Sequence, residues 1–281
     1  MGHKTLVGGT AYDISGGKVL VGGTAYDIKK GRTLVGGAGY DIGFGTPLSD
    51  IPIGGSVFLN VGGVPTEFLI VHIGNPDTSI YDSNCDGVWL LMKDIHSEHN
   101  WNSSNTSGTY YDYSELHSYL NNDVLSEFDT DVQDAILSAS VPIYTWISTG
   151  VYGLAEVTAK VFLLSGVEFG ADASGYGTSA GKGLAPEGAK LDYFLAGSGN
   201  SDTTPDDLRI AYLNGTAVDY WTRSIQYKQP VYAFFISKRG YAYGDNWTSP
   251  STKQFTTSLG VRPAIILPHN ICVDEQYNII V

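Results

Sequence analysis

The sequence is poor in cysteine and in positive charge. Cys85 and Cys272 are its two cysteines, and they lie too far apart in the chain to indicate a disulfide framework or a zinc motif. Lys and Arg number 16 against 29 Asp and Glu, which gives a net charge of −13. Nucleic acids and anionic lipid surfaces are bound through clustered basic side chains, so this balance argues against both as partners. Two buried free thiols are the simplest expectation for the cysteines.

Long apolar segments are also lacking. No run approaches the roughly 20 apolar residues that cross a bilayer, and the N-terminus has no apolar stretch typical of a secretory signal. We therefore expect synthesis in the cytoplasm without a signal peptide, and no membrane insertion. Glycine, with 35 residues, and tyrosine, with 19, are abundant. They indicate a turn-rich, β-rich protein with a large aromatic surface.

Residues 1–45 contain three copies of one short sequence repeat. The copies start at Lys4, Lys18 and Arg32, and each has a short apolar run, a Gly-Gly pair and a second run that contains a tyrosine. Gly-Gly between β-prone runs is typical of a hairpin, so each copy is predicted to be about one strand pair. Units this short cannot bury a hydrophobic core by themselves. We therefore expect residues 1–45 to be an assembly module that is ordered only in a homo-oligomer or on a larger assembly, and we favour a trimer. The residues expected to make these contacts are Leu6, Tyr12, Ile14, Leu20, Tyr26, Ile28, Leu34, Tyr40 and Ile42.

Residues 46–281 have the pattern of an α+β domain, which follows a hinge predicted at residues 43–47. Alternating apolar residues predict a hairpin with strands at 57–61 and 67–73, and a buried strand within 87–95. Helical spacing over 112–140 predicts two helices. The candidate caps are Asp112 or Ser114 for the first helix and Asp129 or Asp131 for the second.

The rest of the domain is predicted to return to strands. A short apolar strand is expected within residues 159–170, and a Gly, Ser and Ala-rich stretch without periodicity follows to residue 204. Later strands are expected in "VDYWTRS", "PVYAFFIS", "GYAYG" and "LGVRPAIILP". Trp221, Phe234 and Phe235 are expected in the core, and Arg223 and Arg262 are expected to pair with buried carboxylates.

Four segments in this order carry a family resemblance: "YSELHSYLNNDVLSEF", "KVFLLSGVEF", "DYWTRS" and "LGVRPAIIL". From about Phe68 to Pro268 the chain resembles a bacterial and phage domain family of unassigned activity. The resemblance implies a C-type-lectin-like fold, shared with formylglycine-generating enzymes and with variable tip proteins of some phages. The repeats resemble N-terminal modules of structural proteins from phages of Gram-positive bacteria. Together the resemblances imply a virion protein whose repeats attach it to other virion proteins.

Enzymatic alternatives are weaker. "GTSAG" at residues 177–181 has the spacing of a nucleophile elbow, with His269 downstream, but neither a strand nor a helix is predicted around Ser179. "HSEH" at residues 96–99 has two histidines three residues apart, which could bind a metal from a helix or turn; no third ligand is evident, and polar surface histidines are the expectation. "DTTPDD" at residues 202–207 lacks the spacing of a calcium loop and is expected to hold solvated turn carboxylates, although calcium binding stays open. The oxidase activity within the resembled fold needs neighbouring cysteines, which this chain lacks. We expect no catalytic residue, no cofactor and no metal.

The composition late in the chain favours binding. Tyrosine and tryptophan mixed with Asn, Ser and Gly is typical of recognition loops, and the same aromatics can stack on sugars. The residues expected to bind a ligand are Tyr227, Tyr241, Tyr243, Asn246 and Trp247. We therefore expect a non-enzymatic phage structural protein, in a tail fibre or tip or a capsid fibre, that binds a host-surface glycan or protein. A decoration protein without a ligand is the alternative, and a serine hydrolase is a third.

Overall fold

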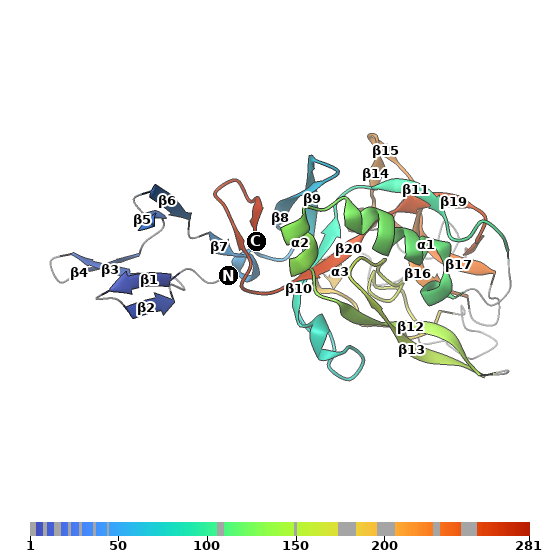
Figure 1. The fold of residues 1–281 in the computed structure, drawn as a ribbon. Helices are drawn as coiled ribbons and strands as arrows, with labels where there is room; N and C mark the ends of the chain where they lie inside the picture. The colour runs from blue at the N-terminus through green and yellow to red at the C-terminus, as the bar shows by residue number, and fades with distance from the viewer. Residues whose placement is uncertain are drawn as a thin grey trace.

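The computed structural model describes residues 45–105, 110–148, 151–173, 184–195, 206–226, 231–242 and 252–281. Within residues 1–44 it describes the backbone of six short strands. Figure 1 shows these strands on one side of a mixed domain that is rich in antiparallel strands and has few helices. In the part of the chain that is described, no helix is long and apolar enough to cross a membrane.

Each repeat forms one antiparallel hairpin, as predicted from its Gly-Gly pair. In the first copy the innermost paired residues are Val7 and Thr10, and Gly-Gly separates them in the sequence; the other two copies have the same register. This register places a basic residue opposite an aspartate in every copy. In the first copy the two residues are Lys4 and Asp13. The hairpins are β1(Lys4–Val7) with β2(Thr10–Asp13), β3(Lys18–Val21) with β4(Thr24–Asp27), and β5(Lys30–Val35) with β6(Ala38–Gly43).

A four-stranded antiparallel sheet lies in the domain. Its order is β20(Ala264–Leu267), β10(Gly87–Met92), β9(Val64–Gly74) and β8(Ser56–Val61). The hairpin β8–β9 and the strand β10 were both predicted. Gly62 and Gly63 both have positive φ, 59° and 77°, as a two-residue hairpin turn requires. All six residues of β10 are buried, as in a strand covered on both faces.

A five-stranded sheet is the second large sheet of the domain. Its order is β11(Ser97–Asn100), β19(Ser258–Val261), β16(Tyr220–Ile225), β17(Tyr232–Ile236) and β18(Thr252–Gln254), and β16 and β19 are its parallel pair. The buried Trp101 ring stacks on Phe255 at 5.3 Å between centroids and meets Trp221 edge-on at 5.8 Å. Trp221, Phe234 and Phe235 are buried, which confirms their predicted place in the core.

The segment "LGVRPAIILP" connects the two sheets instead of forming one strand. It divides at Arg262-Pro263 into β19 and β20, which belong to different sheets. Pro263 has no N–H to continue a ladder, so a break at this point costs little. Arg262 is buried, but its guanidinium donates to the carbonyls of Met92 at 2.8 Å and Lys93 at 2.9 Å and to the Tyr220 hydroxyl at 3.1 Å. The expected carboxylate partner of Arg262 is therefore replaced by main-chain oxygens and a phenol.

The two predicted helices are present. The first comprises α1(Glu115–Tyr119) and a π-helical turn at Leu120–Val124, and the second is α2(Thr130–Ala135). Ser114 caps the first helix, because its hydroxyl accepts a hydrogen bond from the His117 N–H at 3.0 Å. A short helix, α3(Asp192–Leu195), was not predicted. Single 3₁₀ turns occur at Leu48–Asp50, Ser83–Cys85, Tyr111–Tyr113 and Asp207–Arg209.

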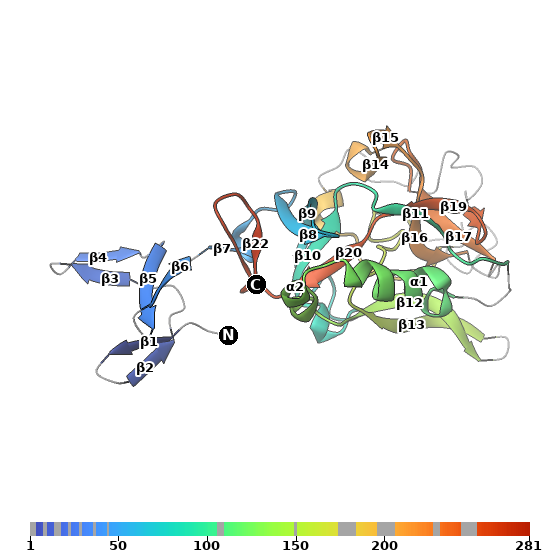
Figure 2. The ribbon, with the colours of Figure 1, turned by 45° about the horizontal axis from the view of Figure 1, so that its top comes forward.

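The strand predictions failed at three places. Residues 159–170 do not form the predicted short strand: Phe162 makes one isolated bridge, and the Leu163 N–H donates to the Tyr111 hydroxyl instead of to a neighbouring strand. The long hairpin β12(Ala139–Ser148) with β13(Val151–Ala159) was missed, because Pro142 interrupts an otherwise β-like sequence. Figure 2 shows this hairpin extending from the body of the domain. Residues 240–242, the described part of "GYAYG", form no extended strand.

The junction with the repeats is partly fixed. β7(Thr46–Pro47), at the end of the predicted hinge, pairs with β21(Cys272–Val273), which also pairs with β22(Ile279–Ile280). The C-terminus therefore lies beside the start of the domain (Figure 1). A side chain at Gly45 would place its Cβ 2.2 Å from the Val273 carbonyl oxygen, so the close approach requires glycine. A small hairpin, β14(Tyr212–Leu213) with β15(Thr216–Ala217), completes the strands.

Candidate functional site

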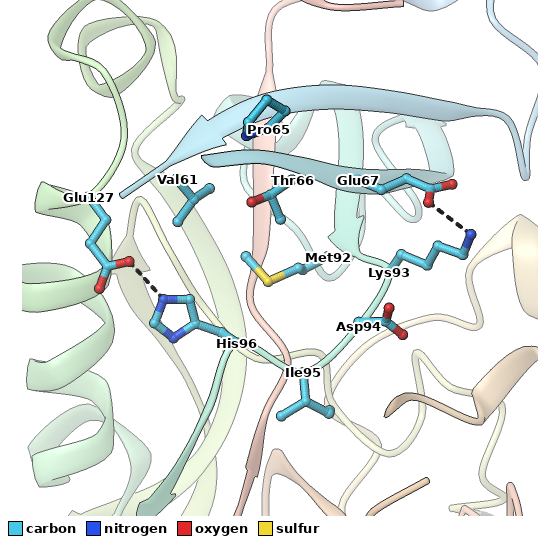
Figure 3. A pocket seen from close by; sticks show the side chains of 10 residues that line it. All are labelled: Val61, Pro65, Thr66, Glu67, Met92, Lys93, Asp94, Ile95, His96 and Glu127. Atoms are coloured by element: carbon cyan, nitrogen blue, oxygen red, sulfur yellow. Dashed lines mark hydrogen bonds and ion pairs between the residues drawn. The ribbon is translucent and has the colours of Figure 1, made fainter. Parts of the chain in front are cut away.

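A polar pocket of about 350 Å³ opens between the β8–β9 hairpin, the segment after β10 and the end of the first helix (Figure 3). Two pairs of polar side chains lie on opposite sides of it, and Thr66 and Met92 lie between them. Its volume is at the lower end of the range for small-molecule sites. The lining residues are Val61, Pro65, Thr66, Glu67, Met92, Lys93, Asp94, Ile95, His96 and Glu127.

Glu67 and Lys93 form the first pair. The Lys93 N–H donates to the Glu67 carbonyl at 2.9 Å just beyond β10, which brings the two side chains together. Lys93 Nζ then lies 2.8 Å from Glu67 Oε2, and the Ser56 hydroxyl donates to Glu67 Oε1 at 2.5 Å. Partial burial raises the pKa of Glu67, but the hydrogen bonds from Lys93 and Ser56 outweigh it and leave this pKa below its ordinary value. Glu67 is therefore a carboxylate with a fixed orientation.

His96 and Glu127 form the second pair. His96 Nε2 lies 2.9 Å from Glu127 Oε2, and His96 Nδ1 lies 3.0 Å from the Ser97 hydroxyl. That hydroxyl lies 3.0 Å from the Tyr119 hydroxyl, so both ring nitrogens of His96 have partners and the ring is oriented. The Glu127 carbonyl accepts from the Gly62 N–H at 2.8 Å, which ties the helix end to the hairpin turn.

Arg262 supports the pocket without lining it. Its hydrogen bonds to the Met92 and Lys93 carbonyls hold the backbone from which both side chains project. The guanidinium also lies over the Tyr220 ring, 5.5 Å from the centroid. A buried arginine fixed by three acceptors is a rigid support, so the position of Lys93 is determined by the core of the domain.

The chemistry of the pocket suits binding. Among the lining side chains a hydroxyl is present on Thr66, and it donates its proton to the Val64 carbonyl at 3.0 Å. An activated nucleophile needs a base within reach of its proton. What the pocket offers is a set of oriented donors and acceptors around apolar atoms of Val61 and Met92.

A second polar cluster lies in the core. Arg223 pairs with Glu168 through two hydrogen bonds, of 2.5 Å and 2.6 Å, which confirms the predicted carboxylate partner of Arg223. Tyr81 donates to the same carboxylate at 2.7 Å, and Glu187 accepts from the Tyr144 N–H at 2.8 Å. Burial raises the pKa of Glu187 to about 7, although the charge of Arg223 opposes the shift. Arg223, Glu168 and Glu187 are at most 1% exposed, so this cluster is structural.

The predicted ligand-binding residues are only partly visible. Tyr241 is half-buried at a turn, where its N–H donates to the Ser237 hydroxyl at 3.3 Å and its carbonyl accepts from the Ser237 N–H at 3.0 Å. The other four, Tyr227, Tyr243, Asn246 and Trp247, lie outside the described residues. Of the predicted assembly residues, Ile14 and Ile28 also lie outside them, and the rest occupy strands of the three hairpins.

The remaining candidate motifs lie in different surroundings from those expected. "HSEH" lies at and in the strand β11 instead of a turn or helix, and the His99 ring stacks on Tyr119 at 4.4 Å. The described residues contain no group of three or more potential metal ligands. In "DTTPDD", Asp206 is buried and caps the turn Asp207–Arg209, so the expectation of solvated carboxylates was wrong for this residue. Ser179 of "GTSAG" lies outside the described residues.

The cysteine prediction was half right. Both thiols are free, and Cys85 is buried, but Cys272 is only half-buried because it lies in the small sheet at the junction with the repeats. Burial raises the pKa of Cys85 to about 12, and the negative charge of Glu168 adds to the effect.

The fold and pocket define a β-rich mixed domain with a small polar cavity at one edge of its central sheet. Residues 86–269 match the family described as "Domain of unknown function (DUF6273)", and the chain belongs to this family. Neither the comparison with curated proteins nor that with solved structures found a match.

Sequence reasoning singled out one of the four polar residues that flank the pocket. His96 was considered as a metal ligand, whereas Glu67, Lys93 and Glu127 were not considered. A weak local signal exists for Lys93, which directly follows a buried strand, where polar side chains often line a site. Glu127 has none, because its proximity to His96 depends on how the first helix packs against the β8–β9 turn.

Proposed function

We propose that this chain is a non-enzymatic structural protein of a phage particle, in a tail or capsid fibre, whose C-type-lectin-like domain binds a component of the host surface. The repeats attach the chain to the particle or to other copies, and the domain with its pocket faces outward. The fold and virion assignments rest on the family resemblance of the four domain segments and of the repeats.

One structural observation supports separate roles for the repeats and the domain. The six repeat strands pair only within their own hairpins, whereas β7, at the start of the domain, pairs with β21 near the C-terminus. Within the described strands the repeats thus share no sheet with the domain. Three equal units with identical register suit repeated contacts in an assembly, and the separate domain provides a pocket for a ligand.

Labelled antibodies against the full chain test the virion assignment. In electron micrographs of intact particles from a lysate that contains this protein, we expect the label at tails or on capsids. Particles that carry no label, although the protein is present in the lysate, would show that it is not a virion component.

Binding of the purified full chain to cell envelopes tests the second part. We expect saturable binding to the envelope of the host from which the particles are prepared. Labelled particles combined with no binding to any envelope fraction would favour a decoration protein without a ligand.

A further inference from the structure

We propose that the pocket between Glu67–Lys93 and His96–Glu127 binds an uncharged saccharide of about one or two rings. The inference rests on the proposed function for the source of the sugar, a host-surface glycan. The binding chemistry itself is argued from the pocket alone.

The pairing of the charged side chains on the two sides of the pocket favours a neutral ligand. Glu67 is paired with Lys93 at 2.8 Å, and Glu127 is hydrogen-bonded to His96 at 2.9 Å. These two carboxylates therefore already have partners. Asp94, a third carboxylate in the lining, is exposed to solvent, where water screens its charge. An ion entering this pocket would have to compete with an existing partner, whereas a neutral polar ligand adds hydrogen bonds to groups that keep theirs.

The remaining hydrogen-bonding capacity fits hydroxyl groups. The Lys93 ammonium has three N–H donors, and Glu67 accepts one of them. The Glu127 carboxylate can accept several hydrogen bonds, and its bond to His96 uses part of that capacity. A sugar hydroxyl both donates and accepts, so neighbouring hydroxyls of one ring can accept from Lys93 and donate to Glu127. Val61 and Met92 provide apolar contact for the C–H groups of the ring.

Preorganisation supports a binding role over an incidental groove. Two of the polar side chains that flank the cavity are held by a further group: Ser56 orients Glu67, and Ser97 with Tyr119 orients His96. Arg262 fixes the backbone of Met92 and Lys93. Side chains that are ordered before binding lose less entropy when a ligand arrives.

The test uses the full chain and purified sugars. Isothermal titration and saturation-transfer NMR are run with glucose, galactose, mannose, N-acetylglucosamine and disaccharides of each, and with glucosamine and glucuronate as charged counterparts. We expect at least one neutral sugar to bind saturably, and more tightly than its charged counterpart. Lys93→Met and Glu127→Gln should each weaken it by about tenfold or more, since each removes a hydrogen bond to a charged group.

Matched controls separate the pocket from general effects. Lys238→Met and Glu98→Gln change exposed residues outside the pocket lining and should leave sugar affinity unchanged. Lys93→Arg keeps the cation and should retain binding, which would show that binding requires the positive charge at this position and not the lysine itself. No binding of any neutral sugar, or binding by both pocket variants that is as tight as that of the natural chain, overturns the proposal. Preferred binding of glucosamine overturns it too, because it identifies a cation site.

Failure of this inference is distinguishable from failure of the proposed function. If both pocket variants still bind the envelope, the proposed host-binding function holds, but the ligand binds at another site, for instance near Tyr241. Sugar binding by a protein that is absent from particles keeps the pocket assignment and removes the virion role.

Discussion

Arg223 and Glu168 form a two-point ion pair in the interior, with N–O distances of 2.5 Å and 2.6 Å and with both side chains fully shielded from solvent. Arg223 also donates to the carbonyls of Pro142 and Leu163, each at 2.9 Å. One side chain therefore joins the strand β16, the hairpin β12–β13 and the segment after it. A buried pair of this kind fixes geometry more than it adds stability.

Removal of one partner should be costly. Arg223→Met leaves Glu168 as a buried carboxylate without its cation, and we expect a loss of about 3–5 kcal/mol in the free energy of unfolding. The measurement is chemical denaturation of the full chain followed by tryptophan fluorescence. The double change Arg223→Met with Glu168→Gln should lose less than the sum of the two single changes, because no unpaired charge remains. Additive losses would contradict the coupling.

Glu187 should make stability depend on pH near neutrality. Its folded pKa is about 7 against an ordinary value of 4.5, so the folded state keeps a proton that the unfolded state has already released. The contribution of Glu187 to stability is therefore greatest below about pH 4.5, and it is lost as the pH rises towards 7. This difference between the folded and the ordinary pKa of Glu187 corresponds to on the order of 3 kcal/mol in the free energy of unfolding.

Glu187→Gln tests this contribution. The glutamine cannot ionise, so the variant should lose less stability than the natural chain between pH 5 and pH 8, as measured by denaturation midpoints at both values. Glu98→Gln, at an exposed position, is the matched control and should follow the natural chain. Parallel pH profiles for all three proteins would show that Glu187 is ionised throughout.

The two thiols should differ in reactivity. Burial is the main cause that raises the pKa of Cys85, to about 12, so at pH 8 it is a shielded thiol. Cys272 is half-buried near the protein surface. We expect a thiol reagent to label Cys272 in the native chain and Cys85 only during unfolding, as shown by mass spectrometry of peptides. Cys272→Ser should then show no native labelling, and rapid labelling of Cys85 would contradict the packing of β10.

Gly240 is required by both its conformation and its surroundings. Its φ is +81°, and a Cβ at this position would lie 2.2 Å from the Asp206 carbonyl oxygen. Gly215 has nearly the same φ, +79°, with nothing within 4 Å of its Cβ position. Gly215→Ala should therefore cost about 1 kcal/mol for the backbone alone, and Gly240→Ala about 3 kcal/mol because Asp206 must also move. Equal losses in thermal unfolding would show that the contact is easily relaxed.

Local patterns predicted the local structure well. Gly-Gly pairs identified the repeat hairpins and the β8–β9 turn, and helical spacing identified α1 and α2, because each signal lies within one short segment. The failures arose where the backbone finds its partners elsewhere. After β13, the Phe162 N–H donates to the Ala264 carbonyl and the Leu163 N–H donates to the Tyr111 hydroxyl, and both partners lie far away in the sequence, where no local pattern reveals them.

The pocket was harder to predict for the same reason. Glu67, Lys93 and Glu127 come from three segments, and their proximity depends on the ladder between β9 and β10 and on contacts of the helix end with the β8–β9 hairpin, at Gly62 and at the bridge between Val61 and Phe128. The aromatic residues predicted to bind a ligand stay a prediction, since all but Tyr241 lie outside the described part of the chain.

The register of the repeats gives the last prediction, which concerns assembly. Lys4 pairs opposite Asp13, and the same positions hold Lys18 opposite Asp27 and Arg32 opposite Asp41. Opposite charges across a strand pair contribute roughly 0.2–1 kcal/mol each, and like charges oppose pairing. A hairpin this short is marginal without a partner, so losses of this size should decide whether it forms.

Charge reversal in the full chain tests whether paired hairpins drive self-association. We expect the natural chain to sediment as an oligomer, and the triple change Asp13→Lys, Asp27→Lys and Asp41→Lys to sediment as a monomer. This triple change moves the net charge from −13 to about −7, which lessens overall repulsion, so a loss of association cannot come from net charge. Adding Lys4→Asp, Lys18→Asp and Arg32→Asp restores opposite pairs and should restore the oligomer. A monomeric natural chain, or three identical sedimentation profiles, would show that the repeats do not assemble through these hairpins.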